Sequence, residues 1–534
     1  MKIIVTESIA EEGIQQLRDH GFEVDARFGI GREELLNIIA DYDAIIVRSV
    51  TNVNKELLDR APKIKVVGRA GNGVDNIDLQ TCTSRGIIVV NTPESNTMAA
   101  AELAIAHAYA LFRNLIQAVE AGRNHDFRRG NFIGKELEGK TVGIIGLGRI
   151  GSIVAKKLAG SNMRVIAYDP YITDERFENL GVKRCKTLEE LLPQADLITI
   201  HTPKTAETIG IIGEREIAMC KDGVRLVNAA RGGLINEKAL YDALVSGKVA
   251  AAGIDVLEKE PNYNKKPEDQ DYDNPLLHLP NCNITPHLGA STEEANYNVG
   301  TAVTKLVGQA LNGMVVPAVN MPPIKAGNME EIKPYIDICE DLGKIYFQTE
   351  KTPVDMIEIK YSGDLAEKET DILTLSVIKG FLEPVVRSTV NYVNAKNILQ
   401  NMGVSFIESK YSKLEKYTNL VTVTFKNKDK ELSVSGTVFA KTEIRIVDFF
   451  GYKMDFVPTD YVLAIQNNDV PGIIGKIGTC LGRHGINIDA MQWSRGKTEG
   501  KAESFVSVNQ AVSKEVIEEL RELEGVLRVS QICF

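Results

Sequence analysis

Cysteine is scarce in this sequence and shows no pairing pattern, which weighs against two classes of protein. The seven cysteines, at positions 82, 185, 220, 282, 339, 480 and 533, form neither a CxxC motif nor a zinc-ligand spacing. A disulfide-stabilised secreted fold and a structural zinc domain are therefore not indicated. We expect reduced thiols, no metal and a cytoplasmic location.

Long apolar runs and an excess of positive charge are also missing. No stretch of about 20 apolar residues suggests a membrane span, and the start, MKIIVTESIAEEG, carries an acid at position 7 in place of the apolar core of a signal peptide. With 62 Lys and Arg against 72 Asp and Glu, the net charge is −10, which argues against nucleic-acid binding. An anionic ligand must therefore be held by local arginines.

The length of 534 residues is too great for one hydrophobic core, so three or four domains are expected. Residues 1–96 alternate the β-branched runs KIIV, AIIVRS, KVVGRA and GIIVVNT with helical stretches, which predicts a small parallel α/β domain. Residues 97–290 repeat that rhythm and predict a doubly wound α/β sheet, with strands at 141–146, 163–169, 196–201, 224–229, 249–256 and 283–285.

Two long helices are predicted beside this second region. The segment AAAELAIAHAYALFRNLIQAVEAG has apolar residues on most sides, so we expect one face of it to pack on another subunit. The sequence STEE at 291–294 has capping-box spacing and predicts a helix to about Asn312. That helix would return the chain to the first region, so residues 1–96 and 291–320 are expected to form one discontinuous domain, with a cleft between it and residues 97–290.

The pattern changes after VVPAVNMPPIKAG, which predicts a domain boundary near residue 322. Residues 321–455 combine helices with the strand-like segments VDMIEIKYSG, NLVTVTF and ELSVSGTVF, an α+β pattern. Residues 458–534 predict the βαββαβ order of ferredoxin-like domains, with strands at 461–467, 486–493, 503–509 and 526–532.

A glycine-rich turn in the second region predicts a dinucleotide site. Gly146, Gly148 and Gly151 follow a predicted strand and open an amphipathic helix. In such a G-x-G-x-x-G turn the pyrophosphate lies on the helix N-terminus. Asp169 ends the next strand, where its carboxylate can accept both ribose hydroxyls and would repel a 2′-phosphate. NAD is therefore favoured over NADP.

Three polar residues at predicted strand ends fit the oxidation of a hydroxy acid. Arg231 lies in LVNAARGGLINE, Glu260 in AAGIDVLEKEP and His287 in NITPHLGAST. If Glu260 fixes one imidazole nitrogen, His287 can take the substrate proton at the other. The guanidinium of Arg231 matches the fork of a carboxylate. Each residue alone has an ordinary structural explanation, and only their shared position at one sheet edge favours catalysis.

These motifs resemble the D-isomer-specific 2-hydroxyacid dehydrogenases. The resemblance rests on GLGRIG, HTP (201–203), NAARGG (228–233), GIDVLEKEP (253–261) and PHLGAST (286–292), with RAGNGVDNID (69–78) and NTPESNTMAAAE (91–102) in the first region. It implies an NAD-binding Rossmann-type domain and a flavodoxin-like substrate domain. The long carboxyl extension, with an intervening domain and an ACT-like module, resembles that of the members that oxidise 3-phosphoglycerate in the first step of L-serine biosynthesis.

The resemblance also implies roles for residues. Arg231, Glu260 and His287 would be the catalytic set, with His287 the acid/base. NAD would contact Asn72, Gly146, Gly148, Arg149, Ile150, Gly151, Asp169, Thr202, Ala229, Asp255, His287, Gly289 and Ala290. The substrate 3-phosphoglycerate would be bound by Arg48, Arg69, Asn72, Gly73, Arg231 and, from a neighbouring subunit, Arg129. Asn72 departs from the Thr or Ala that many relatives carry.

The terminal segment QNNDVPGIIGKIGTCLGRHGINID resembles amino-acid-sensing ACT domains. Asn467, Asp469 and Asn487 match positions that would bind an effector such as L-serine between two paired modules. Val470 stands where a basic residue is often found, so a module that only dimerises stays open as an alternative. The resemblance further implies a homotetramer built from two kinds of dimer contact.

Two other functions stay open at this point. One is a dehydrogenase for another 2-hydroxy acid, such as glycerate, lactate or 2-hydroxyglutarate. The other is a transcriptional corepressor, because proteins of that kind share the dehydrogenase core. The ACT-like module and the arginines at 48 and 69 argue against a scaffold.

Overall fold

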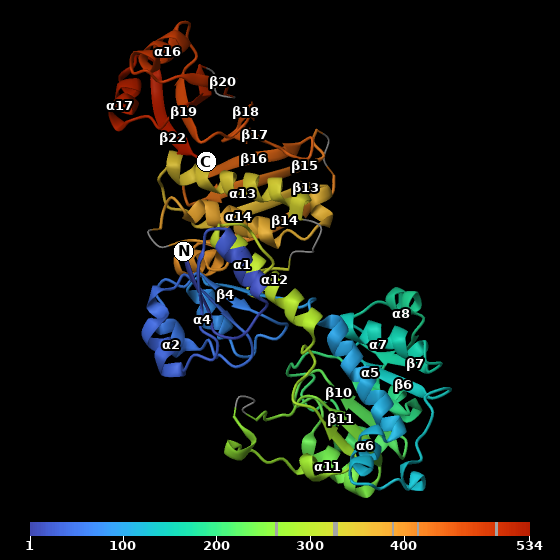
Figure 1. Cartoon of the computed structure of the whole chain (residues 1–534). Coiled ribbons are helices and arrows are strands. Elements are labelled where there is room, and N and C mark those ends of the chain that lie inside the picture. Colours follow the sequence, from blue (N-terminus) through green and yellow to red (C-terminus); the bar gives the residue numbers. More distant parts are fainter. Residues whose placement is uncertain (262–264, 324–328, 387–388, 414–415, 497–499) are drawn as a thin grey trace.

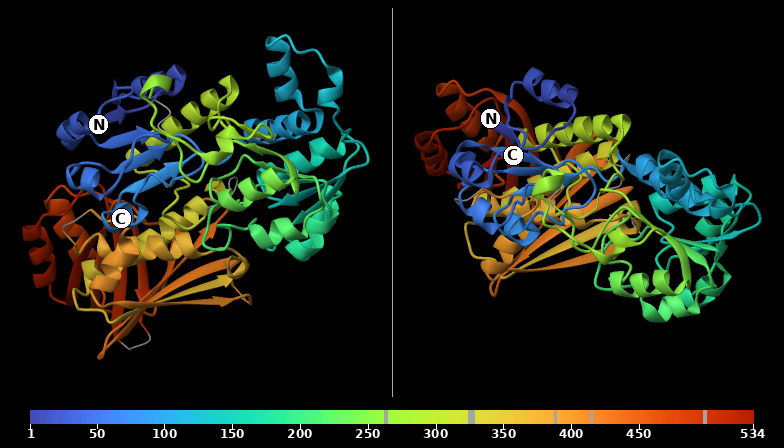
Figure 2. Two further views of the ribbon diagram at one scale, coloured as in Figure 1. Left: turned by 90° about the horizontal axis from the view of Figure 1, so that it is seen from below. Right: turned by 60° about the horizontal axis from the view of Figure 1, so that its bottom comes forward.

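The computed structural model describes residues 1–261, 265–323, 329–386, 389–413, 416–496 and 500–534. Four β-sheets follow one another along the described chain. In Figure 1 the first sheet lies between the second sheet and the carboxyl-terminal half. Both views of Figure 2 keep the second sheet and the terminal module on opposite sides of the molecule. The linker predicted around residue 322 lies partly outside the described residues.

The first sheet is parallel, with strand order β2-β1-β3-β4-β5. This is the flavodoxin-like order, and its central strands are apolar and buried, as expected when helices cover both faces. Its strands are β1 (Lys2–Val5), β2 (Glu23–Ala26), β3 (Ala44–Val47), β4 (Val66–Arg69) and β5 (Ile88–Asn91), and its helices α1 (Glu11–Asp19), α2 (Arg32–Ile38), α3 (Lys55–Asp59) and α4 (Leu79–Ser84).

The second sheet is the doubly wound sheet that the sequence predicts, with strand order β12-β11-β10-β9-β6-β7-β8 and every pair parallel. Its strands are β6 (Thr141–Ile145), β7 (Arg164–Tyr168), β8 (Lys183–Arg184), β9 (Leu197–Ile200), β10 (Val224–Asn228), β11 (Val249–Ile254) and β12 (Cys282–Ile284). Its helices are α7 (Arg149–Ala159), α8 (Asp174–Leu180), α9 (Leu188–Leu191), α10 (Glu214–Met219) and α11 (Glu237–Ser246). The two-residue strand β8 was not predicted.

The two sheets are joined by helices, one of which differs from the prediction. The apolar segment after residue 97 forms two helices, α5 (Thr97–Arg113) and α6 (Leu115–Arg123), because Asn114 between them takes a left-handed conformation with φ of 47°. On the return, α12 (Glu293–Leu311) has Thr292 as its N-cap, one residue after the predicted Ser291, and the Thr292 hydroxyl accepts a hydrogen bond from Ala295 N–H. It packs against α1 on the first sheet (Figure 1).

The third sheet belongs to the middle of the chain and has order β14-β13-β15-β16-β17-β18. Its strands are β13 (Met356–Gly363), β14 (Ser405–Tyr411), β15 (Asn419–Lys426), β16 (Glu431–Phe439), β17 (Glu443–Phe449) and β18 (Tyr452–Phe456), with helices α13 (Met329–Thr349), α14 (Asp371–Leu382) and α15 (Ala395–Asn401). The strands β14, β17 and β18 were not singled out from the sequence. The Asn391 amide donates to Gly86 O at 2.5 Å, so this region touches the first domain.

The terminal module has the predicted βαββαβ order and the antiparallel sheet order β20-β21-β19-β22. Its elements are β19 (Tyr461–Asn468), α16 (Ile473–Arg483), β20 (Ile488–Arg495), β21 (Lys501–Val508), α17 (Lys514–Glu522) and β22 (Val526–Cys533). Among the described residues, one group of potential metal ligands lies within 4.8 Å, namely Cys480, His484 and Glu519. Glu519 already pairs with Arg483 and His484, each at 2.6 Å.

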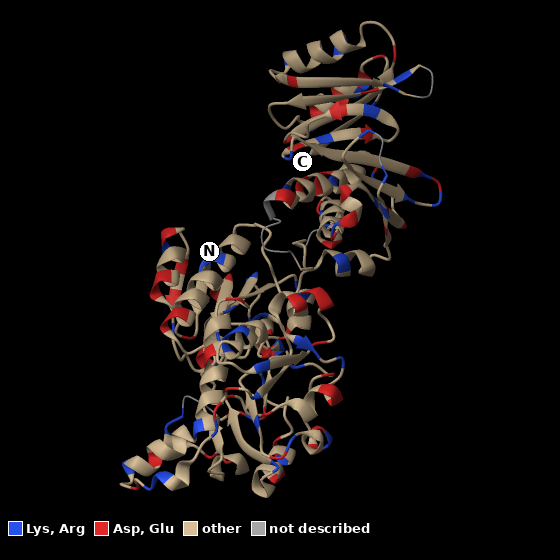
Figure 3. Cartoon of the chain, turned by 90° about the vertical axis from the view of Figure 1, so that its right-hand side faces the viewer, with Lys and Arg blue, Asp and Glu red and all other residues tan. Residues whose placement is uncertain are grey.

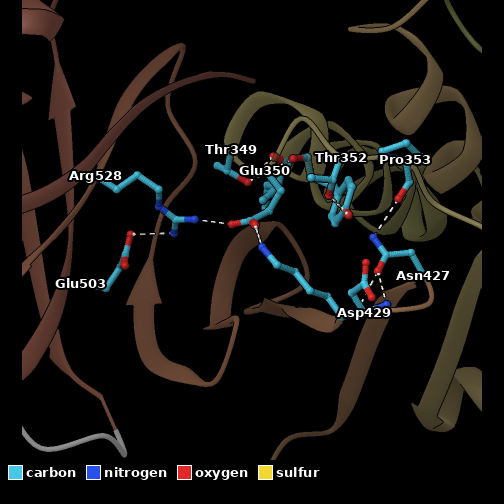
Figure 4. A network of polar contacts seen from close by, with 11 residues as sticks. Thr349, Glu350, Thr352, Pro353, Asn427, Asp429, Glu503 and Arg528 are labelled. Carbon is cyan, nitrogen blue, oxygen red and sulfur yellow. Dashed lines mark hydrogen bonds and ion pairs between the residues drawn. The ribbon is translucent and has the colours of Figure 1, made fainter.

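Both faces of the terminal sheet are packed against other parts of the molecule. Leu463 and Ile465 pack on α16 and α17, whereas Val462, Ala464 and Phe505 join the core of the middle region. Figure 4 shows the polar contacts at this junction, where Arg528 of β22 points to Glu350 after α13 and lies 3.7 Å from Glu503. Because apolar and charged contacts combine here, the module is docked on the middle region as well as tethered to it.

Positively and negatively charged residues are intermixed in most of the molecule. Figure 3 shows acidic and basic residues mixed along most of the ribbon. Among the helices in the described ranges, none is both long enough and apolar enough to cross a membrane.

Candidate active site

The glycine-rich turn has the geometry that a dinucleotide needs. Gly146 has φ of 91°, a conformation that glycine adopts readily. A Cβ on Gly151 would lie 2.1 Å from Gly146 O, so the close approach of helix α7 to the turn requires glycine there. A Cβ on Gly148 would meet no atom within 4 Å. The protein itself leaves that space open, which suits a pyrophosphate above the N-terminus of α7.

Polar groups around the turn also suit the cofactor. Asp169 follows β7 and accepts hydrogen bonds from Leu147 N–H and Tyr171 N–H, both at 2.9 Å. These bonds orient the carboxylate, and its remaining lone pairs can accept hydrogen bonds from the ribose hydroxyls. The Thr202 hydroxyl is buried and has no hydrogen-bond partner among the described residues. A buried hydroxyl without a partner is costly, so a ligand atom at this position would stabilise it.

His287 and Glu260 meet beyond the ends of β11 and β12, with His287 Nδ1 2.8 Å from Glu260 Oε1. Both side chains are about one third exposed, at 37% and 33%. His287 has φ of 56°, and its backbone N–H donates to Asp255 O and Thr285 O. A non-glycine residue in this left-handed region is held there by its surroundings, a situation that is common at functional sites.

Asp255 supplies much of that constraint. Its Oδ1 accepts from Thr285 Oγ1 at 2.6 Å and from Leu288 N–H at 2.7 Å, and its Oδ2 accepts from Gly289 N–H at 3.0 Å. The carboxylate therefore holds the chain on both sides of His287. The family resemblance implied only an NAD contact for Asp255, and its link to the histidine segment was not foreseen.

Arg231 extends from the edge of the second sheet to the first domain. Its Nε lies 3.8 Å from Asp75 Oδ2, and a Cβ on Gly73 would lie 2.5 Å from its Nη2. Asn228 fixes the turn, because its amide donates to Arg231 O at 2.9 Å. Gly73 thus leaves open the space that the Arg231 guanidinium occupies. Asp75 was not singled out from the sequence, where an acid beside an expected anion site gave no functional signal.

Arg48 and Arg69 lie at the carboxyl edge of the first sheet, after β3 and at the end of β4. Arg69 folds over Gly71, where a Cβ would lie 1.9 Å from its Nη1. Its Nη1 donates to Ala70 O at 2.6 Å, and its Nε is buried with no hydrogen-bond partner among the described residues. Burial lowers the pKa of Arg69 to about 10, and the nearby positive charges of Arg231 and Arg48 act in the same direction.

The positive charges around Arg69 indicate what kind of ligand this site can bind. The guanidinium groups of Arg48 and Arg231 are close enough to Arg69 to lower its pKa, and the carboxylates of Glu7 and Asp75 act in the opposite direction. Like charges brought together without enough counter-charge stabilise an anion when one is bound. The arrangement thus suits a small acid with more than one negative charge.

Other predicted residues lie less centrally. Arg149 pairs with Glu94 at 2.9 Å, beside the glycine turn. Asn72 O accepts from the Asn91 amide at 2.6 Å. The Arg129 segment is different, because Asn131 and Phe132 line a hollow together with Ala250 and Asn281, at the amino ends of β11 and β12. Arg129 therefore does not join the arginines of its own chain.

Two other histidines of the second domain, His107 and His201, are poor candidates for proton transfer. Burial lowers the pKa of His201 to about 4, and its Nε2 lies 2.9 Å from Thr199 Oγ1. Burial also lowers the pKa of His107, whose Nε2 lies 3.1 Å from Thr285 Oγ1. Both imidazoles are packed as neutral groups, whereas His287 is partly exposed beside Glu260, where it can exchange protons with a ligand.

The three predicted effector residues do not meet within one chain. Asn467 pairs with Ala502 near one end of the terminal sheet, and the Asp469 carboxylate binds Arg495 at 2.9 Å. Asn487 precedes Ile488, which pairs with Val508 at the other end. Ala502 and Val508 are six steps apart along β21, which is about 20 Å at the usual strand rise. The Asn467 side chain is fully buried, and its Oδ1 has no partner among the described residues.

Comparisons with known proteins agree with this geometry. Residues 105–289 match the NAD binding domain of D-isomer specific 2-hydroxyacid dehydrogenases, residues 331–450 match the D-3-phosphoglycerate dehydrogenase intervening domain, and residues 461–525 match the ACT domain. The D-3-phosphoglycerate dehydrogenase of Archaeoglobus fulgidus is 41% identical over 100% of both chains. That of Bacillus subtilis is 38% identical over 99% of both.

This chain belongs to the D-3-phosphoglycerate dehydrogenase family. It has the NAD-binding domain of that family, and the predictions of an NAD-dependent dehydrogenase, of its fold class and of its ACT domain are confirmed. Solved structures match the dehydrogenase core. Treponema pallidum D-lactate dehydrogenase is 29% identical with a TM-score of 0.54 and covers 61% of this chain and 100% of its own. A D-2-hydroxyisocaproate dehydrogenase is also 29% identical with a TM-score of 0.54, and covers 60% and 99%.

Proposed function

We propose that this protein oxidises 3-phospho-D-glycerate to 3-phosphohydroxypyruvate with NAD, at the site formed by Arg231, Glu260 and His287. The observation that carries the substrate is the cluster of Arg48, Arg69 and Arg231, in which the pKa of Arg69 is lowered by burial and by its positive neighbours. A substrate with both a carboxylate and a phosphate supplies the missing negative charge. Relatives named for this activity match the chain from end to end.

The proposed chemistry divides the work among the three residues. When bound, NAD would supply the acceptor for the hydride of the substrate carbon that carries the hydroxyl. His287 accepts the hydroxyl proton as that carbon becomes a ketone, so one hydride and one proton leave together. Glu260 binds Nδ1, orients the ring and stabilises the imidazolium that forms. Arg231 binds the substrate carboxylate through its planar fork and keeps the reacting carbon in place.

The residues of the glycine turn would hold the cofactor. Gly146, Gly148 and Gly151 leave room for the pyrophosphate, with Arg149 and Ile150 beside it. The Asp169 carboxylate would bind the ribose hydroxyls, and the Thr202 hydroxyl would bind a neighbouring polar atom of NAD. Gly289 lies close to Ala229 and Asp255, and Ala229, Gly289 and Ala290 would contact the nicotinamide.

The proposal is tested by the initial rate of NADH formation. We would compare 3-phosphoglycerate, D-glycerate, D-lactate and 2-hydroxyglutarate as substrates of the wild-type protein. A strong preference for 3-phosphoglycerate is expected. Comparable rates with all four would leave a dehydrogenase of different specificity, and no turnover with any of them would favour the corepressor function.

We also propose that L-serine acts through the ACT domain of a homotetramer. The support is the separation of Asn467 and Asp469 from Asn487 along one sheet, since a second module is needed to bring such residues together. The exposed apolar residues Leu115 and Ile116 of α6 support a further contact between dehydrogenase domains. Inhibition of the NADH rate by L-serine, and a tetramer mass by light scattering, would test these two points.

A further inference from the structure

Glu7 lies at the carboxyl end of β1, next to the arginine cluster, and its carboxylate binds the loop that carries Arg48. Oε1 accepts hydrogen bonds from Arg48 N–H and Thr51 N–H, both at 2.9 Å, and Oε2 accepts one from Val50 N–H at 3.1 Å. Three N–H groups that converge on one carboxylate form a small anion-binding nest. Because the acceptor is charged, these bonds are stronger than neutral ones.

The same loop is held from its other side. The Asn76 amide donates to Arg48 O at 2.9 Å and to Thr51 O at 2.6 Å. The hydroxyls of Thr6 and Thr51 lie 2.9 Å apart. Residues 48–51 are thus clamped between β1 and the segment before α4, although they form neither helix nor strand. Arg48 itself is held by a bond from its Nη1 to Ser8 O at 3.2 Å.

The charge of Glu7 would be a disadvantage if the residue had no positional role. A carboxylate beside a site for a multiply charged anion repels that anion. Glu7 is close enough to Arg69 to affect its charge equilibrium. The bonds to three loop N–H groups give the carboxylate a different use, because they fix the backbone from which Arg48 extends.

We propose that Glu7 is a positioning residue for substrate binding, which fixes residues 48–51 so that Arg48 and Arg69 face the substrate phosphate together. This inference rests on the proposed function. The hydrogen bonds of Glu7 go to the backbone of residues 48–51, so its removal should affect the binding of a phosphorylated substrate and leave proton and hydride transfer unchanged.

The test is a steady-state comparison of Glu7→Gln with the wild-type protein. The amide keeps one acceptor oxygen and places an NH₂ group against a loop N–H, so the nest is broken while the shape is conserved. We expect the KM for 3-phosphoglycerate to rise by about tenfold, the size of one hydrogen bond to a charged group. The turnover number, the KM for NAD and the KM for D-glycerate should stay within about twofold.

Glu12→Gln is the matched control, because it removes the same charge from an exposed position in the first turn of α1. It should leave all four constants unchanged. If Glu7 acts only through its charge, Glu7→Gln will instead lower the KM for 3-phosphoglycerate, and this result would overturn the inference. Identical behaviour of the two variants would overturn it as well.

Asn76→Ala provides a second variant should Glu7→Gln fail to fold, because it releases the loop without changing charge. It should raise the KM for 3-phosphoglycerate and leave the turnover number unchanged. An unchanged KM would show that the hold of Asn76 on residues 48–51 does not matter for substrate binding. The proposed function is judged separately by the wild-type protein. If the wild type shows no preference for 3-phosphoglycerate, that proposal fails, whereas a clear preference with an unaffected Glu7→Gln variant rejects only the role of Glu7.

Discussion

Charged side chains gather in two parts of the molecule, and they are paired differently in each. The carboxyl edges of the first two sheets carry Arg48, Arg69 and Arg231. Glu7 and Asp75 are the carboxylates that counter the charge around Arg69, and Arg69 Nε has no hydrogen-bond partner in the described part of the chain. At the junction of the middle region and the terminal module, Glu350 binds both Arg528 and Lys430. A surplus of one charge indicates a ligand, whereas matched charges hold structural elements together.

The glutamates of the two regions show the same contrast. Glu260 pairs with His287 on loops, and both side chains are about one third exposed. Glu350 is almost buried, with 8% of its side chain exposed, and it connects α13 to β22. The first pair can exchange protons with a ligand. The second is fixed by its surroundings, and we expect substitutions there to affect stability before turnover.

The largest effect should come from His287→Ala. Loss of the group that accepts the substrate proton should lower kcat by a factor of about 10² to 10⁴. The variant should retain the thermal unfolding midpoint of the wild type, because the imidazole is partly exposed. A folded His287→Ala protein with near-normal turnover of 3-phosphoglycerate would remove His287 from the chemistry.

Arg528→Met should affect the other region by a different measure. It leaves the buried carboxylates of Glu350 and Glu503 without their guanidinium, which should lower the free energy of unfolding by on the order of 3 kcal/mol. Chemical denaturation followed by circular dichroism would measure this loss. Arg483→Met is the matched control, because the exposed Arg483–Glu519 pair should contribute less than about 1 kcal/mol. Equal effects of the two substitutions would contradict the contrast between the regions.

Glu503→Gln should reveal a pH-dependent cost at the junction. Burial raises the pKa of Glu503 from its ordinary 4.5 to about 7. Between these values the folded protein holds a proton that the unfolded chain has released, so stability falls as the pH rises through this window. The variant should match the wild type near pH 4.5 and exceed its unfolding free energy by on the order of 2 kcal/mol at pH 8. The same difference at both pH values would contradict the shifted pKa.

Asp169→Ala should have the smallest effect and concerns the cofactor alone. Without the carboxylate, a 2′-phosphate is no longer repelled, and the ribose hydroxyls lose an acceptor. The ratio of kcat/KM for NAD to that for NADP should fall by about tenfold or more. An unchanged ratio would show that Asp169 does not contact the ribose.

The sequence was sufficient for those features that depend on local patterns. The glycine turn, the βαββαβ order of the terminal module and the alternation of strands and helices were all predicted, because each has its own spacing. The meeting of His287 and Glu260 was also predicted, since parallel strands end at one edge of a sheet. The roles of the site residues beyond this geometry stay predictions.

Other features depend on contacts between distant segments and gave no such signal. The break at Asn114 comes from one left-handed residue in an otherwise helical pattern. Asp255 holds the His287 segment through bonds that span about 30 residues, and the docking of Val462 and Phe505 on the middle core joins two domains. A strand that is buried on both faces by different domains reads in sequence like any buried strand.

The account rests on the claim that the arginine cluster recognises a phosphate, and substrate selectivity of Arg69→Met tests it most directly. The measurement is the ratio of kcat/KM for 3-phosphoglycerate to that for D-glycerate, in the variant and in the wild type. We predict that the ratio falls by about 10² in the variant, through 3-phosphoglycerate alone, because one buried charged contact is lost. An unchanged ratio, with both substrates affected equally, would contradict the phosphate site.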